Sequence, residues 1–367
     1  MLKKIISLVL AVLVALLCFG GCKSTNSLEG AHVFMFKCTG NSYGNTMNTG
    51  FQEVMKKAGV KSAFKAPSES TVTDQVKMID TLITQKVASI TISAVGDTGY
   101  NEVFKRAKEA GITVVSADSA TAPDNRTVHI DPCYPKDIGI SLVEVSVLIA
   151  LGVEYPENED TSKVMEDALK NYNGKEIKFG VLSAASDTVM QNMWIDAMRT
   201  ELKRDIYKGK VSEDFEVKYG NDDPTLCTSH SIAFNAENKI DVLIAPDTIA
   251  MAAAGQVLTS SKSKIKLTGL GLPSEMQSFM PKSPTDNAFD YVCPYMLLWN
   301  VKDFGAVAAA ATLAACDGKY DGKVGSTFTY NGKTYTTTKA DDGGTNVISL
   351  EPYVFYKGNM ADWKDKL

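Results

Sequence analysis

Polar residues that could do chemistry follow directly after short apolar segments in the first half of the chain. Asp118 comes after Thr113–Ser116, and Lys37 comes after Val33–Phe36. A carboxylate at the end of a strand can accept hydrogen bonds from two hydroxyl groups, and a neighbouring ammonium group would balance its charge. The spacing also allows a simpler interpretation, in which Asp118 caps a turn and Lys37 is a solvated surface lysine.

The second half of the chain offers two more candidates. Asp247 follows the apolar segment Asp241–Ala245, where it is better placed to cap the next helix than to contact a ligand. Trp299 lies at the joint between two segments, where its ring can either stack on the C–H face of a sugar or pack in the core. Each position therefore has both a structural and a ligand-binding interpretation.

Motifs for cofactors, metals and catalysis are missing from the sequence. No Walker loop, G-x-S-x-G elbow or H-E-x-x-H motif occurs, and the three histidines lie far apart. Gly269-Leu270-Gly271 lacks the third glycine and the downstream acidic residue of a dinucleotide loop. Glycoside hydrolysis needs two carboxylates that flank the bond, and only Asp118 is well placed. We therefore expect no cofactor, no metal and no enzyme activity, with a secreted carbohydrate-active enzyme as the alternative from another class.

The composition is that of an ordinary globular protein. Of 367 residues, 44% are hydrophobic and 22% are charged, which excludes a disordered chain, a fibre and a small disulfide scaffold. The formal net charge is −5, and phosphate neutralisation needs a clustered cationic surface, so we expect no nucleic-acid partner. The cysteines after Cys22 are odd in number and widely spaced, without a C-x-x-C pair, so we expect buried thiols rather than disulfides.

The N-terminus is typical of an exported protein. A short positive start precedes the apolar run Ile5–Leu17, which is too short for a membrane span of about 20 residues, and two glycines precede Cys22. This order resembles the cleavage box of bacterial lipoproteins, although Phe19 stands where that box usually has Leu. We expect a signal peptide over residues 1–21, a lipid on Cys22 that anchors the chain to a membrane, and a polar tether over 22–30. Ordinary signal cleavage at the same place, leaving a soluble protein, is the alternative.

From residue 31 onward, short apolar segments typical of strands alternate with segments of helical periodicity. In the first half we predict strands and helices alternately at 33–36, 45–58, 61–65, 73–85, 89–92, 100–110 and 113–116. The pattern repeats at 178–182, 190–204, 216–219, 225–237, 241–245, 248–260 and 266–269, and a long helix covers 301–316. Such alternation requires right-handed crossovers and parallel sheets covered by helices. The fold class is therefore α/β, with two doubly wound lobes whose strand ends can face each other across a cleft.

Two segments interrupt this alternation. Leu151–Glu176 is polar and rich in Asn and Glu, which predicts a surface insertion. Gly322–Tyr335 alternates apolar and polar residues around Asn331-Gly332, which is a strong hairpin signal.

The ordered segments Asp74–Ala120, Ser183–Arg199, Ile244–Gln256 and Thr268–Met276 resemble type I periplasmic sugar-binding proteins, in the branch that binds rhamnose or the furanosyl autoinducer. The resemblance covers nearly all of residues 31–367. It implies a monomeric receptor with two lobes and a three-crossover hinge that closes around one small sugar or polyol. Such a receptor delivers its ligand to the permease and ATPase of an ABC importer, in the periplasm or on the outer face of a bacterial membrane. A receptor that reports to a chemoreceptor or sensor kinase is the alternative.

The same resemblance implies how the chain divides between the lobes. The N-terminal lobe would comprise residues 31–131 plus 300–347, and the C-terminal lobe 132–299 plus 348–367. Short connections at the crossovers can absorb the change in backbone angles that hinge closure needs. The loop Pro281–Asp290 is longer than is usual in this family, which leaves the shape of the cleft rim open.

Carried over by position, the resemblance also implies a set of ligand contacts. They are Lys37, Asn41, Tyr43 and Asp118 from one lobe, Gln191, Pro246 and Thr248 from the other, and Trp299 and Asn300 at the hinge. Autoinducer binders carry an aspartate at the position of Met190 and an alanine at the position of Thr248, which argues against the autoinducer as ligand. At Asn300 an amide replaces the family's aspartate.

Overall fold

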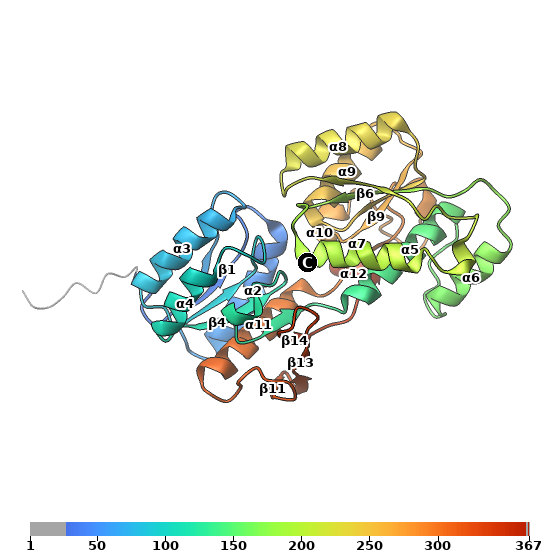
Figure 1. Ribbon diagram of the computed structural model, residues 1–367. Coiled ribbons are helices and arrows are strands. Elements are labelled where there is room, and N and C mark those ends of the chain that lie inside the picture. The colour runs from blue at the N-terminus through green and yellow to red at the C-terminus, as the bar shows by residue number, and fades with distance from the viewer. Residues whose placement is uncertain (1–26, 365, 367) are drawn as a thin grey trace, which may run out of the picture.

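The computed structural model describes residues 27–364 and 366, so the predicted signal peptide, Cys22 and most of the tether lie outside the described residues. Figure 1 shows two α/β lobes side by side, joined where the chain crosses between them. The predicted fold class is confirmed.

The first lobe is built on a seven-stranded sheet. Its strands lie in the order β13-β14-β5-β4-β3-β1-β2 and run parallel except for β13. The strands are β1 His32–Met35, β2 Ser62–Lys65, β3 Ser89–Ile92, β4 Thr113–Ala117, β5 His129–Asp131, β13 Thr338–Lys339 and β14 Thr345–Ile348. The order 2-1-3-4-5 of its first five strands is a doubly wound topology, in which ligands bind beyond the carboxyl ends of the strands.

Helices cover both faces of this sheet because side chains alternate along each strand. Phe34 packs in the core on the face covered by α2 (Ser42–Lys57) and α11 (Val301–Cys316). Val33 and Met35 pack on the opposite face, which α3 (Val72–Thr84) and α4 (Asn101–Glu109) cover. Gly50 of α2 lies so close to α11 that an added Cβ would be 1.8 Å from the carbonyl oxygen of Lys302, so the tight packing of this pair requires glycine there.

The second lobe repeats this design on a smaller sheet. Its parallel strands lie in the order β7-β6-β8-β9, and a bridge from Leu270 to Leu297 continues the sheet to the antiparallel pair β10–β15. The strands are β6 Phe179–Ser183, β7 Glu216–Tyr219, β8 Val242–Ala245, β9 Lys266–Gly269, β10 Met296–Leu298 and β15 Tyr353–Phe355. Its helices are α5 Pro135–Leu151, α6 Thr161–Lys170, α7 Val189–Glu201, α8 Pro224–Glu237, α9 Thr248–Ser260, α10 Pro273–Met276 and α12 Met360–Trp363.

The chain crosses between the two sheets three times, from β5 to α5, from β10 to α11 and from β14 to β15. Two of these crossings are tied together at Asp131. Its side chain accepts a hydrogen bond of 2.6 Å from Asn346, and its backbone carbonyl accepts one of 2.7 Å from Ser349. The crossings are therefore short and adjacent, as a hinge requires.

Most predicted elements are confirmed, several with the same ends, but α5, α12 and the short strands β5, β10, β13, β14 and β15 have no counterpart among the predictions. The α5 sequence is apolar on nearly every side, and most of the helix is buried, so it lacks helical contrast between polar and apolar positions. The prediction of a surface insertion over Leu151–Glu176 was wrong in part. This segment contains α6, whose Met165 and Leu169 are fully buried in the core.

The predicted hairpin is confirmed. Strands β11 (Thr327–Tyr330) and β12 (Lys333–Thr336) pair antiparallel, and the φ angles of Asn331 and Gly332 are +49° and +80°. Both central residues are thus left-handed, as in the two-residue turn that this dipeptide favours.

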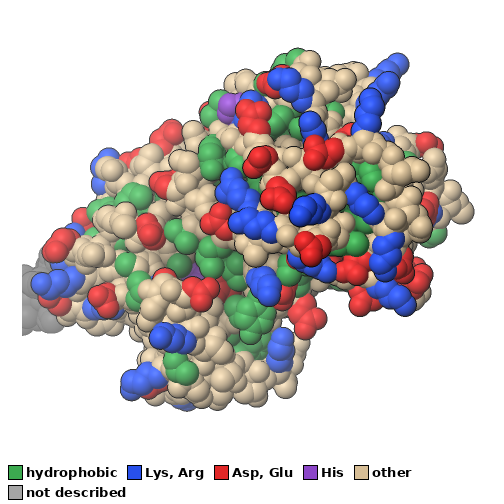
Figure 2. All heavy atoms as spheres, turned by 45° about the vertical axis from the view of Figure 1, so that its right-hand side comes forward, with side chains coloured by type: hydrophobic (Ala, Val, Ile, Leu, Met, Phe, Trp, Pro, Cys, Tyr) green, Lys and Arg blue, Asp and Glu red, His purple; other side chains and the backbone are tan. Residues whose placement is uncertain are grey.

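The cysteines of the described residues are all free thiols, and Cys133, Cys227 and Cys293 are buried, whereas Cys38 and Cys316 are half-buried. None of the described helices is long and apolar enough to span a membrane. On the face shown in Figure 2, basic and acidic side chains are intermingled rather than gathered into one cationic patch.

Candidate functional site

A cavity of about 410 Å³, its open mouth included, lies between the carboxyl ends of the two sheets. All predicted contact residues except Asn300 line it, and the complete lining is Phe36, Lys37, Asn41, Tyr43, Asp118, Gln191, Trp194, Asp222, Pro246, Asp247, Thr248, Leu270, Leu298 and Trp299. The topology thus brings together residues from loops that are far apart in the sequence.

The first lobe contributes an ion pair. Lys37 follows β1 and Asp118 follows β4, and the Lys37 Nζ lies 3.5 Å from the Asp118 Oδ2. Ser93, after β3, donates a hydrogen bond of 2.7 Å to the same oxygen. Asp118 adopts a left-handed conformation with φ +69°, which is costly for most residues but common for Asp and Asn. The local backbone therefore turns this carboxylate towards the cavity edge, where Lys37 and Ser93 hold it.

Burial by itself would lower the pKa of Lys37, but the carboxylates around the cavity outweigh burial. Asp118 contributes most, and Asp222 and Asp247 of the second lobe add to it, so the pKa of Lys37 is raised above its ordinary value. Lys37 is therefore a cation in the site. Its three N–H groups can serve both Asp118 and a ligand hydroxyl.

Aromatic residues of the first lobe and the hinge form one wall. The Trp299 Nε1 donates a hydrogen bond of 3.1 Å to the Tyr43 hydroxyl, and the two rings meet edge to face. Burial, with a contribution from Asp118, raises the pKa of Tyr43 well above its ordinary value, so the phenol stays neutral. Asn41 uses its Oδ1 to cap α2 through the Gly44 N–H at 2.9 Å, which leaves its amide N–H groups for other partners.

The second lobe contributes buried polar atoms that have no partner. The Gln191 Nε2 donates to the Pro246 carbonyl oxygen at 3.2 Å, which fixes the amide, while its Oε1 is buried without a hydrogen bond. The indole Nε1 of Trp194, one helical turn further along α7, is likewise buried and unpartnered. An unsatisfied buried donor and acceptor are costly, and here both belong to residues that line the cavity, where a ligand hydroxyl could satisfy them.

Asp247 combines the two roles that the sequence offered as alternatives. It caps α9 by accepting from the Ala250 N–H at 2.8 Å, and it also lines the cavity. Burial first, and then the charge of Asp222, raise the pKa of Asp247 to about 7. Thr248, the first residue of α9, is buried beside it.

Asn300 was predicted to contact the ligand, but it does not line the cavity. Asn300 caps α11, accepting from the Asp303 N–H at 3.1 Å and donating to the Asp303 Oδ2 at 2.7 Å. The start of that helix satisfies the amide, so Trp299 alone of this pair reaches the cavity. The long loop Pro281–Asp290 does not line the cavity either.

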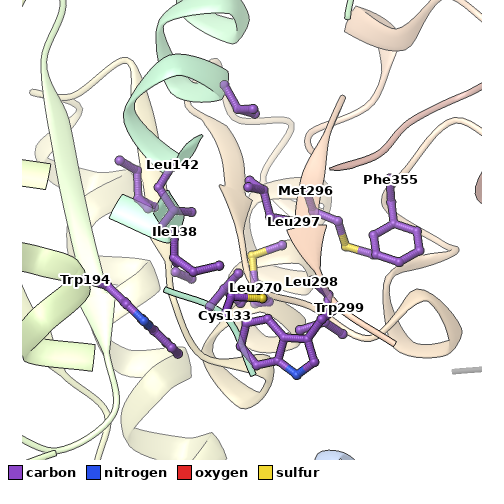
Figure 3. Close-up of a cluster of buried hydrophobic side chains, with 14 of the residues drawn as sticks. Cys133, Ile138, Leu142, Trp194, Leu270, Met296, Leu297, Leu298, Trp299 and Phe355 are labelled. Atoms are coloured by element: carbon purple, nitrogen blue, oxygen red, sulfur yellow. The ribbon is translucent and has the colours of Figure 1, made fainter. Parts of the chain in front are cut away.

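The structure adds lining residues that were not predicted. Trp194 lies one helical turn after Gln191, a spacing that could have identified it. Asp222 lies in the loop after β7, so the strand-end argument could have been extended to it. Phe36, Leu270 and Leu298 are apolar and gave no signal in the sequence. Figure 3 shows that Trp299, Leu298 and Leu270 are continuous with the buried hydrophobic cluster around β10 and α5.

The arrangement suits a hydroxyl-rich ligand held between aromatic and apolar walls. The family model of the periplasmic binding protein domain matches residues 32–320. The chain belongs to the periplasmic binding protein family. Members of this family are extracytoplasmic receptors for small solutes rather than enzymes.

Solved structures agree with this assignment. An ABC transporter solute-binding protein from Clostridium phytofermentas with bound L-rhamnose is 30% identical, with a TM-score of 0.80 over 92% of this chain and 99% of that one. A sugar ABC transporter protein from Actinomyces odontolyticus is 25% identical, with a TM-score of 0.65 over 92% and 98%. LsrB from Clostridium saccharobutylicum in complex with AI-2 is 23% identical, with a TM-score of 0.75 over 91% and 99%, and shows the same fold.

Proposed function

We propose that this periplasmic binding protein is a lipid-anchored receptor that binds a neutral monosaccharide between its lobes and delivers it to an ABC importer. The observation that carries the proposal is the pair of buried, unpartnered atoms Gln191 Oε1 and Trp194 Nε1, which belong to residues that line the same cavity as the Lys37–Asp118 pair. Sugar hydroxyls both donate and accept, so one ring can satisfy groups of both kinds.

Closure follows from where these groups lie. Lys37 and Asp118 belong to the first lobe, whereas Gln191 and Trp194 belong to the second, so one ligand bonds to all of them only when the lobes are together. Such a ligand binds the closed form more tightly than the open form and shifts the population towards closure. A permease can then recognise the loaded receptor by its shape.

L-rhamnose is the first sugar to test. The relative that holds L-rhamnose matches nearly the full length of both chains, and the cavity here includes the apolar residues Phe36, Leu270 and Leu298, which suit a deoxysugar methyl group. Met190 and Thr248, at positions where autoinducer binders carry an aspartate and an alanine, make AI-2 a weaker candidate.

A thermal-shift screen followed by calorimetry tests the binding proposal. L-rhamnose, D-fucose, D-arabinose and D-tagatose should be compared at equal concentration, because a ligand that binds only the folded chain raises its melting temperature by mass action. We expect at least one of these sugars, with L-rhamnose first, to raise the melting temperature and to give a single-site calorimetric isotherm. If none of them does so, the sugar proposal is wrong.

The anchor is tested separately in cells. We expect the wild-type chain to incorporate a labelled fatty acid and to sediment with membranes, and the Cys22→Ala variant to do neither. A wild-type chain that is exported without a lipid would support ordinary signal cleavage instead.

A further inference from the structure

The loop after β7 holds Asp222 in an unusual conformation. Asn221 and Asp222 have φ angles of +52° and +55°, so two consecutive residues with side chains are left-handed. The surrounding structure imposes this geometry, because the Gly220 and Asn221 N–H groups donate to the carbonyl oxygens of Ser183 and Ala184 at 2.8 and 3.1 Å. Backbone conformations of this kind persist only where neighbours enforce them, and they cluster at ligand clamps.

The side chain of Asp222 is presented to the opposite lobe. Its Oδ2 accepts a hydrogen bond of 3.4 Å from the Ser70 hydroxyl, and Ser70 lies in the loop between β2 and α3 of the first lobe. Within the described part of the chain, this is the only hydrogen bond of the Asp222 side chain. Asp118 and Asp247, in contrast, bond to residues of their own lobes.

Electrostatic attraction between the lobes favours the closed form, as this hydrogen bond does. Lys37 is a buried cation of the first lobe, and it interacts electrostatically with Asp222 and Asp247 of the second lobe. Separation of the lobes would lose both that attraction and the contact with Ser70. The interactions of Asp222 with the first lobe therefore stabilise only the closed form.

We infer that Asp222 and Ser70 form a latch across the mouth of the cavity, and that Asp222 is a positioning residue that slows the release of an enclosed ligand. The inference rests on the proposed function, because it assigns a role to the rim of the same site. An interaction made only in the closed form acts mainly on the dissociation rate.

A double-mutant cycle on L-rhamnose binding tests the latch. Asp222→Gly removes the carboxylate and tolerates the left-handed backbone, and Ser70→Ala removes its partner. We expect each variant to raise the dissociation rate of L-rhamnose about threefold to tenfold, with little change in the association rate, and the double variant to be no worse than Asp222→Gly. Additive losses in the double variant, or an unchanged dissociation rate in both single variants, would overturn the latch.

Two matched variants separate the latch from a general effect on the loop. Asn221→Gly relieves backbone strain at the neighbouring position but keeps Asp222, so its dissociation rate should equal that of the wild type. Asp222→Asn suits the left-handed backbone and can still accept from Ser70, so it should recover part of the loss of Asp222→Gly. Equal losses in Asn221→Gly and Asp222→Gly would assign the effect to the backbone and overturn the latch.

A cross-link tests the geometry without any sugar. In a Cys38→Ser background, Ser70→Cys combined with Asp222→Cys should form an intramolecular disulfide under mild oxidation, and faster when L-rhamnose is present. If no cross-link forms under either condition, the two residues do not meet and the latch is wrong. If the cross-link forms and L-rhamnose changes neither its rate nor the melting temperature, the latch stands and L-rhamnose is not the ligand.

Discussion

The two halves of the cavity are prepared for a ligand to different degrees. In the first lobe, the Asp118 carboxylate is already held by Lys37 at 3.5 Å and by Ser93 at 2.7 Å. In the second lobe, the Gln191 Oε1 and the Trp194 Nε1 are buried without partners. In the proposed function, the first lobe offers a preorganised surface on which a ligand can dock, whereas the second lobe would complete its hydrogen bonds when a ligand is enclosed.

This difference implies an order of events. A sugar would meet the ordered charges of the first lobe while the cleft is open, and the second lobe would follow because closure satisfies its buried groups. Changes in the first lobe should therefore weaken the initial contact as well as the final complex. Changes in the second lobe should act on the closed complex.

The largest effect is expected from Asp118→Ala. This change removes an acceptor for ligand hydroxyls and leaves the buried Lys37 ammonium without its carboxylate, at a cost of about 1–3 kcal/mol or more. We expect the calorimetric affinity for L-rhamnose, or for another sugar that the screen identifies, to fall at least tenfold. Asp97→Ala, an exposed acid of the same lobe, is the control and should bind normally. Unchanged binding by Asp118→Ala would remove this residue from the site.

Gln191→Ala and Trp194→Phe should each lower the affinity threefold to tenfold, which corresponds to about 1 kcal/mol for one lost hydrogen bond. Trp194→Phe keeps an aromatic ring but removes the N–H, which has no partner in the structure described here, together with part of a buried ring. The smaller ring should lower the melting temperature of the sugar-free variant, and the rise on addition of sugar should shrink as well. Equal losses of stability with and without sugar would contradict the assignment of these atoms to the ligand.

A smaller effect is expected from the titration of Asp247. Its pKa is raised from the ordinary value near 4 to about 7, first by burial and then by Asp222. Between these values the folded chain holds a proton that the unfolded chain has lost, so stability falls as the pH rises from about 4 to about 7 and then stays level.

Asp247→Asn isolates this term because Asn caps a helix as well as Asp does. We compare the difference in melting temperature, variant minus wild type, at two pH values. This difference should be larger at pH 8 than at pH 5 by about 2–4 °C. Parallel melting curves across this range would mean that Asp247 is ionised throughout.

The same contrast between the halves explains what the sequence could reveal. Lys37, Asp118 and Asp247 follow strands, and parallel strands bring their carboxyl ends to one edge, so their convergence was predictable. Gln191 and Pro246 required the family resemblance, because nothing in their spacing shows that the amide donates to the carbonyl. Helix α5, which packs against α7, was not predicted because its sequence is apolar on nearly every side.

The other features of the site depend on backbone conformation and on contacts between residues that are distant in the sequence. The left-handed angles of Asn221 and Asp222 arise from hydrogen bonds to the strand-end residues Ser183 and Ala184, far away in the sequence. Nor can residue type decide whether Asn300 meets a ligand or caps a helix, because an amide suits both roles. Its neighbours decide that question.

Asn300→Ala should have the smallest effect on binding and so marks the edge of the site. The side chain is committed to Asp303 at the start of α11, and the change should lower the free energy of unfolding by about 0.5–2 kcal/mol through loss of the cap. The affinity for sugar should stay within twofold of the wild type, because Trp299 before it keeps its hydrogen bond to Tyr43. Chemical denaturation and calorimetry on the same preparation separate the two quantities. A loss of affinity without a loss of stability would return Asn300 to the ligand contacts and extend the cavity to the hinge.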